Sequence, residues 1–180
     1  MHHDLLLTRG AHQLRALTKA DVPALLALAE RHAAEYVQMG VSPTLPAFYL
    51  DAPDQMHFVS LVSGEYAGST RYMELRPAHK RLEIGSTWLA PPFMRTAANR
   101  TFKLLQLTHA FEVMGMRRVE IKTDVVNVRS QTAIAALGAV REGVLRKHMV
   151  RSDGTERDTV MFSITGDEWP GVKARLEWGR

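Results

Sequence analysis

The chain has 180 residues, a formal net charge of +4 and a hydrophobic content of 46%, which is ordinary for a globular protein. It has no cysteine, which excludes disulfides, thiolate metal sites and a cysteine nucleophile. Its Lys and Arg residues are scattered among Asp and Glu, so the positive charge disfavours a nucleic-acid partner and suits a small anionic ligand.

No repeat or linker divides the chain, and its length fits one domain, so we expect a single domain over residues 1–180. No apolar run approaches the ~20 residues that cross a bilayer, and the first ten residues lack a secretory cleavage site. We therefore expect a cytoplasmic protein without a membrane partner. The histidines are dispersed and no carboxylate cluster is present, which predicts no metal site.

The N-terminal part is predicted to contain a short strand, a long helix and a loop. The stretch HQLRALTKAD, residues 12–21, is a short strand followed by the start of a helix, where Thr18 and Asp21 have the spacing of a capping box. Leucines and alanines at helical spacing extend this helix to Gly40. Residues 41–53 hold three of the eight prolines and are predicted as a loop with one helical turn.

Three strands follow in the middle of the chain. The segments MHFVSLV and AGSTRYMEL, joined by SGEY, are predicted as a hairpin over residues 56–75. The stretch RLEIGSTWLA is a further strand, and the pair Pro91-Pro92 ends it.

The C-terminal half is predicted to alternate helices and strands. A long helix begins near Arg95 and ends at Gly115, and a strand and a short helix follow it. Next come the arms of a hairpin, and last an amphipathic stretch. The predicted ranges are 118–126 for the strand, 142–150 and 158–164 for the hairpin, and 167–177 for the last stretch. This order predicts an α/β fold in which helices cover a mixed sheet.

The short helix after residue 126 has clear boundary signals. Asn127 is a good N-cap, because its side-chain oxygen can accept a hydrogen bond from the N–H of Ser130. Ile134 and Leu137 lie on one apolar stripe, and Gly138 suits a left-handed C-terminal position.

The start of the long helix breaks an electrostatic rule. Helix N-termini favour acidic side chains, yet Arg95, Arg100 and Lys103 cluster there. No acidic residue occurs over residues 85–110, and the small residues 96–99 leave room for a ligand at the backbone. Two interpretations stay open. The segment is either a solvated basic turn or an anion site, where N–H groups, dipole and cations converge.

Three motifs follow one another in this half of the chain. They are EIG followed by WLAP, the loop-to-helix element MRTAAN, and NVRS before the Gly138 turn and EG. Together these motifs resemble the coenzyme-A-binding core of the GNAT superfamily of N-acetyltransferases. The branch that is most similar includes the ribosomal-protein N-terminal alanine acetyltransferases. The resemblance covers residues 82–164, with looser agreement near the N-terminus.

The resemblance implies a single-domain GNAT fold, with a mixed, mostly antiparallel sheet, two splayed parallel strands and helices on both faces. It implies that residues 94–100 wrap the diphosphate of CoA and that the WLA backbone pairs with the pantetheine arm. Asn127 and Ser130 would lie beside the pantetheine and its sulfur. The cofactor-binding residues implied in this way are Trp88, Leu89, Ala90, Met94, Arg95, Thr96, Ala97, Ala98, Asn99, Arg100, Asn127 and Ser130.

The chain departs from the family pattern at two places. The diphosphate loop of the family often begins with Gln or Arg and has small glycine-type residues at its fourth and sixth positions. Met94, Ala97 and Asn99 occupy these positions here. Many members also carry a tyrosine seven residues after the asparagine, as general acid for the leaving thiolate, and this chain has Ile134 there.

Acetyl transfer to an amine needs a base, an oxyanion donor and a partner for the thiolate. Glu83 is the candidate base, because desolvation beside the thioester would raise the pKa of its carboxyl. The alternative is a strand glutamate that is paired or solvated. A backbone N–H in STWLA suffices for the oxyanion. Ser130 is the candidate thiolate partner, or it satisfies only local backbone.

These observations predict an N-acetyltransferase that uses acetyl-CoA as co-substrate and passes the acetyl group directly to a primary amine. The acceptor is a protein N-terminus or a small-molecule amine, and residues 15–54 are expected to select it. Two alternatives remain: an acyltransferase that uses another acyl-CoA, and a catalytically silent CoA-binding or regulatory module. Monomer and homodimer both stay open.

Overall fold

The computed structural model describes residues 3–50, 54–151 and 153–178. Its centre is a mixed sheet in the order β1-β2-β3-β4-β5-β6-β8-β7. Only the β5–β6 pair is parallel among these strands, so the predicted mixed, mostly antiparallel sheet is confirmed. The strands are β1 Leu6–Arg9, β2 His12–Ala16, β3 Met56–Val62, β4 Glu65–Arg76, β5 Arg81–Leu89, β6 Arg118–Asp124, β7 Val140–Val150 and β8 Glu156–Thr165.

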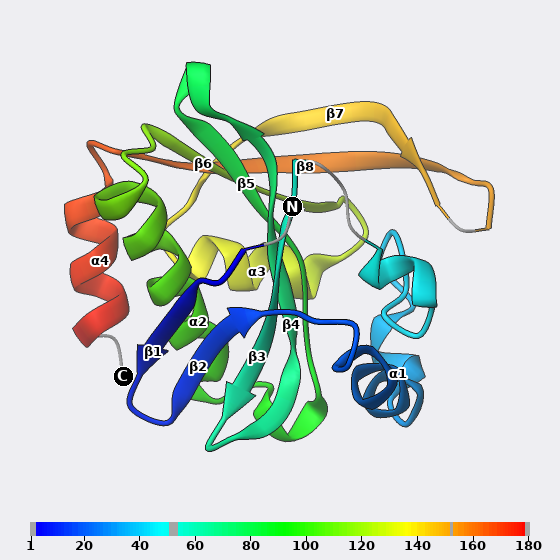
Figure 1. Ribbon diagram of the computed structural model, residues 1–180. Coiled ribbons are helices and arrows are strands. Elements are labelled where there is room, and N and C mark those ends of the chain that lie inside the picture. Colours follow the sequence, from blue (N-terminus) through cyan, green and yellow to red (C-terminus); the bar gives the residue numbers. More distant parts are fainter. Residues whose placement is uncertain (1–2, 51–53, 152, 179–180) are drawn as a thin grey trace.

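Helices cover both faces of the sheet, as predicted. Helices α2, α3 and α4 pack on one face, while α1 packs on the other face and lies apart from them in Figure 1. The helices are α1 Val22–Glu30, α2 Ala97–Thr108, α3 Val128–Ala136 and α4 Trp169–Trp178. Shorter turns are η1 Ala33–Tyr36, η2 Pro46–Tyr49, η3 Pro77–His79, η4 Pro91–Phe93 and the π-turn η5 His109–Val113, which prolongs α2.

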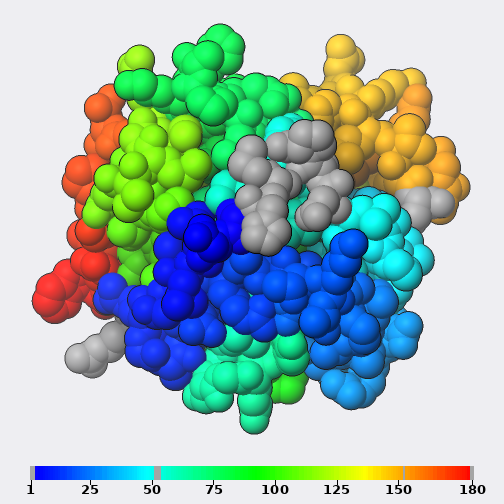
Figure 2. All heavy atoms as spheres, viewed as in Figure 1, coloured from blue at the N-terminus to red at the C-terminus, as the bar shows by residue number. Residues whose placement is uncertain are grey.

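Two apolar cores lie on the two faces because strand side chains alternate. On the α2 face, Phe58, Tyr72 and Ile84 are fully buried against the helices. On the α1 face, Val59 and Trp88 pack against residues of α1, η1 and η2. In the space-filling view, the atoms of β1 and β2 adjoin those of α1 across the lower part of this side (Figure 2).

The N-terminal helix is shorter than the sequence predicts. It ends at Glu30, and the chain continues as the separate turn η1 instead of reaching Gly40 as one helix. The capping-box prediction is also wrong, because Asp21 immediately precedes the helix. Its carboxylate accepts hydrogen bonds from Thr18 and pairs with Arg15 at 2.7 Å.

Two further differences concern the same part of the chain. Strand β1 was not predicted; it pairs with β2 through a tight turn at Gly10, whose φ is +56°. The predicted loop does contain one short turn, η2, and its residues 51–53 lie outside the described residues.

Candidate functional site

The two parallel strands form a fork. Strands β5 and β6 pair only where Arg81–Glu83 lies beside Arg118–Glu120, and beyond this point the two strands diverge. One arm of the fork continues along β5 toward α2, and the other continues along β6 toward α3. The backbone groups that face the opening are therefore free of a neighbouring strand, which is unusual in the middle of a sheet.

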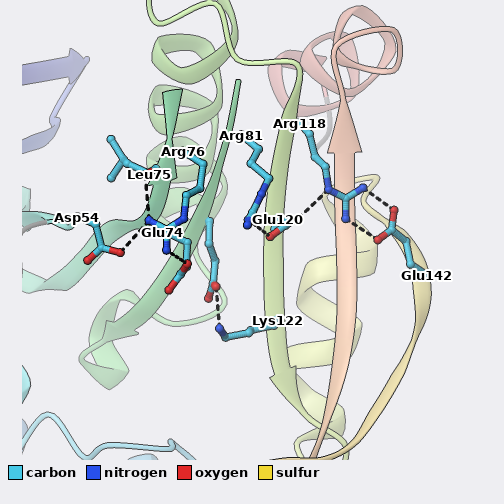
Figure 3. A network of polar contacts seen from close by, with 10 residues as sticks. Asp54, Glu74, Leu75, Arg76, Arg81, Arg118, Glu120, Lys122 and Glu142 are labelled. Carbon is cyan, nitrogen blue, oxygen red and sulfur yellow. Dashed lines mark hydrogen bonds and ion pairs between the residues drawn. The ribbon is translucent and has the colours of Figure 1, made fainter. Parts of the chain in front are cut away.

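Ion pairs close the base of the fork. Arg81 on β5 binds Glu120 on β6 at 3.0 Å, and Arg118 binds the same carboxylate at 2.8 Å. Arg118 also binds Glu142 on β7, so a row of charges crosses four neighbouring strands on one face (Figure 3). This row holds together the end of the fork where the two strands are paired.

Glu83 lies at the point where the strands separate. It is buried, with 3% of the residue exposed, and its carboxylate pairs with the Lys122 ammonium on β6 at 2.8 Å. Burial raises the pKa of Glu83, and the nearby ammonium partly opposes this rise. The predicted pairing alternative for Glu83 is therefore present, with a lysine across the fork as partner.

A bulge in β5 turns its backbone above Glu83. Ser69 pairs with Trp88 and Arg71 pairs with Gly85, so β5 has one residue more than β4 between these two pairs. The extra residue is accommodated at Ser86, whose φ is +46°. The bulge directs the Trp88 side chain into the core on the α1 face, where it is buried.

The open edge of β5 offers backbone groups to the fork. The Ala90 N–H donates to the Ala67 carbonyl of β4 at 2.8 Å, so the backbone groups of Leu89 point the other way, toward the opening. By the same alternation, the Thr87 N–H also faces the opening. The Leu89 carbonyl accepts a hydrogen bond from the Tyr36 hydroxyl at 3.1 Å.

The loop from β5 to α2 forms a basic cradle. Arg95 has φ +57° and lies before the helix, and Thr96 is the N-cap that accepts from the Ala98 N–H. The other N–H groups of the first turn have no partner within the helix, as at every helix N-terminus. Neither Arg95 nor Arg100 forms an ion pair with any described residue.

Lys103 does not belong to this basic cluster, and that prediction is wrong. The side chain turns under the sheet, where only 5% of the residue is exposed. Its ammonium donates to Thr87 Oγ1 at 2.6 Å, and more weakly to Gln106 Oε1 at 3.3 Å. Burial lowers the pKa of Lys103 to about 7. The cradle therefore has two arginines as its cations.

The β6 arm ends in the predicted cap. The Asn127 side chain accepts from the Ser130 N–H at 3.0 Å, and Gly138 follows α3 with φ +100°, so both boundary predictions are confirmed. Ser130 is half-buried in the first turn of α3. Beside it, Arg129 binds the carboxylate and the backbone carbonyl of Glu35, each at 2.8 Å, which ties α3 to η1.

A hollow of about 100 Å³ opens at the end of the β6 arm. Asp124 lies in its wall, buried, and both of its carboxylate oxygens bind Arg151, at 2.7 and 3.0 Å. The Arg151 guanidinium lowers the pKa of this carboxyl. Apolar and charged side chains share the lining: Val37, Met39, Val126, Asp124, Arg151 and Asp153.

The predicted site residues thus fall on the two arms. Glu83, Trp88–Ala90 and residues 94–100 follow one another along β5 and into α2, whereas Asn127 and Ser130 end the other arm. The sequence did not single out Lys122 or Tyr36. Among the described residues no group of His, Cys, Asp or Glu could hold a metal ion, and no described helix is long and apolar enough to cross a membrane.

Comparisons with known proteins point in one direction. Residues 13–140 match the family model described as an acetyltransferase (GNAT) domain. The candidate ribosomal N-acetyltransferase YdaF of Bacillus subtilis strain 168 is 31% identical over 117 residues, which are 63% of this chain and 61% of YdaF. The match therefore spans less than two thirds of that relative's length.

Solved structures agree over nearly the whole chain. A candidate acetyltransferase of T. thermophilus is 38% identical, with a TM-score of 0.86 that covers 98% of this chain and 97% of that one. Mycobacterium smegmatis RimJ, solved in complex with CoA-disulfide, has a TM-score of 0.78 at 21% identity and covers 98% of this chain and 94% of its own. At that identity the likeness concerns the fold alone.

Proposed function

The chain belongs to the GNAT acetyltransferase family, and on this premise we propose that it transfers an acetyl group from acetyl-CoA to a primary amine by direct attack. The observation that carries the proposal is the fork. A basic cradle lies at the far end of one arm, and a buried carboxylate lies at the point where the arms separate. The RimJ complex with CoA-disulfide supports CoA as the ligand.

The cradle suits the diphosphate of CoA. Two arginines without ion-pair partners in the described chain, Arg95 and Arg100, lie at the N-terminus of α2, where backbone N–H groups and the helix dipole also favour an anion. Met94 to Asn99 would wrap the diphosphate through their backbone, and the pantetheine arm would pair with the open edge of β5 at Trp88–Ala90. Asn127 and Ser130 would then flank the arm from β6.

The remaining groups match the chemistry of amide formation. Glu83 would accept the proton of the attacking ammonium, directly or through water, and its ionised form is the one that the Lys122 ammonium stabilises. The Thr87 N–H faces the opening and would bind the oxyanion. Ser130 would donate a hydrogen bond to the leaving thiolate. No step needs a covalent acetyl-enzyme.

The acceptor would enter from the side of η1, where the hollow at the end of β6 offers room for a small side chain. We propose a protein N-terminus as the acceptor, because YdaF is named for a ribosomal substrate. A ribosomal acceptor would place the reaction in the cytoplasm. A small-molecule amine is the competing acceptor.

An acceptor screen tests this function. Purified protein, acetyl-CoA and a panel of peptides with free N-termini and small amines are mixed, and the released CoA thiol is measured. We expect thiol release that depends on a primary amine. Release with another acyl-CoA but not with acetyl-CoA would reassign the donor, and no release with any amine would contradict the proposal.

Acetyl-CoA binding should depend on the two arginines of the cradle. The double variant Arg95→Glu/Arg100→Glu is expected to bind acetyl-CoA at least about tenfold more weakly, because each guanidinium offers charge-assisted hydrogen bonds to the diphosphate. Added salt should weaken binding to the wild-type protein. Calorimetry measures both effects, and equal affinity of the variant and the wild-type protein would remove the diphosphate site from the cradle.

A further inference from the structure

A buried hydroxyl group lies in the opening of the fork. The Tyr36 Oη donates to the Leu89 carbonyl at 3.1 Å, on the edge of β5 that no strand covers. The residue is 2% exposed, and its ring packs edge-to-face on Trp88 with the ring centroids 5.4 Å apart. The hydroxyl is therefore held by packing on the ring and by one hydrogen bond at its tip.

The turn that carries Tyr36 spans the fork. On one side Tyr36 binds the β5 arm through Leu89, and on the other side the neighbouring Glu35 binds Arg129 at the start of α3. Because both arms anchor η1, the position of the hydroxyl is fixed relative to both. The break in the helix after Glu30 is what lets the chain reach across the opening.

We propose that Tyr36 donates a hydrogen bond to the sulfur of CoA as the thiolate leaves. This inference rests on the proposed function. In CoA only a short ethylene link separates the last pantetheine amide from the sulfur. The Leu89 carbonyl has two lone pairs, so it can accept from that amide and from Tyr36 together. The sulfur then lies within hydrogen-bond reach of the tyrosine hydroxyl, where Ile134 supplies no donor.

The hydroxyl acts as a donor that keeps its proton. Burial raises the pKa of Tyr36 to about 12, whereas ordinary thiols have a pKa of about 8.5. The amine nitrogen bonds to the acetyl carbon, the carbon–sulfur bond breaks, and its electron pair goes to sulfur. The nitrogen loses its protons to Glu83 and to water, and the thiolate is protonated by solvent after release.

The pKa of the thiol in bound CoA tests this assignment. Thiolate absorbance is followed in a pH titration of CoA bound to the wild-type protein, to Tyr36→Phe and to Tyr49→Phe. Tyr49 is the matched control, since its buried hydroxyl donates to the Pro43 carbonyl at 2.9 Å. A hydrogen bond to a charged group is worth about one pKa unit or more, so the bound thiol in Tyr36→Phe should titrate about one unit higher.

Turnover gives the second readout. We expect Tyr36→Phe to lower kcat about tenfold or more, with the KM for acetyl-CoA nearly unchanged and with Tyr49→Phe close to the wild-type protein. An unchanged thiol pKa in Tyr36→Phe, or equal losses in both variants, would overturn the role of Tyr36 while the transferase function stands. If wild-type protein does not bind CoA, the proposed function fails first and this inference fails with it.

Discussion

Replacing Glu83 by Gln is expected to lower kcat/KM about 10²–10⁴-fold, the usual contribution of a positioned general base. The amide has the size of the carboxylate but cannot take a proton from the ammonium. Because Glu83 lies on β5, away from the basic cradle at α2, the affinity for acetyl-CoA should stay nearly unchanged. Steady-state kinetics and calorimetry on the same preparation measure both quantities.

The pH dependence sharpens this expectation. Burial raises the pKa of Glu83, so the acid limb of kcat/KM in the wild-type protein should lie above the range of an ordinary glutamate. Below that limb the base is protonated and inactive. In Glu83→Gln the limb should disappear, and the residual rate should climb with pH as more of the acceptor becomes neutral.

Glu120→Gln is the matched control for Glu83→Gln. Glu120 also pairs with cations across β5 and β6, but it lies at the closed base of the fork. Its replacement should cost some stability and leave kcat/KM within a few-fold of the wild-type value. If folded, CoA-binding Glu83→Gln retains full activity at neutral pH, then Glu83 only pairs with Lys122 and another group receives the proton.

Lys103 should make the stability of the protein rise with pH. Its pKa is about 7 in the folded protein, compared with an ordinary value of 10.5. Between these two values the unfolded chain binds a proton at Lys103 that the folded chain lacks, so raising the pH favours the folded state. The slope approaches about 1.4 kcal/mol per pH unit. Below pH 7 both states are protonated and this dependence ends.

Replacing Lys103 by Met should flatten this rise between pH 7 and pH 9. Lys19→Met is the control, because Lys19 is exposed on the surface and its loss should leave the slope as it is in the wild-type protein. Urea unfolding at a series of pH values gives the free energy of unfolding for each protein. Equal slopes in the wild-type protein and Lys103→Met would mean that the buried amine stays charged throughout.

Much of the sheet could be predicted because its signals are local. The β3–β4 hairpin, the stop after β5 and the cap at Asn127 each depend on a few adjacent residues, and each is present in the structure. The splayed strands came from the resemblance of the motifs to the GNAT core. Periodicity alone does not show where two parallel strands separate.

The errors arise where distant parts of the chain meet. Helical spacing continues past Glu30, yet contacts of η1 with Leu89 and Arg129 take the chain out of the helix. Lys103 lies three residues before Gln106 and four before Leu107, both fully buried. That spacing places it on the inner stripe of α2, a signal that its charge concealed. The Glu83–Lys122 pair joins two strands and has no local signal at all.

Direct transfer at the fork is the central claim, and mass spectrometry of one ordered experiment tests it most directly. The protein is first incubated with acetyl-CoA alone, and an acceptor peptide with a free N-terminus is then added. We predict that the intact protein gains no acetyl group in the first step and that the peptide gains one in the second, with one CoA thiol released per peptide. A stoichiometric acetyl adduct on the protein that the peptide then removes would contradict direct transfer.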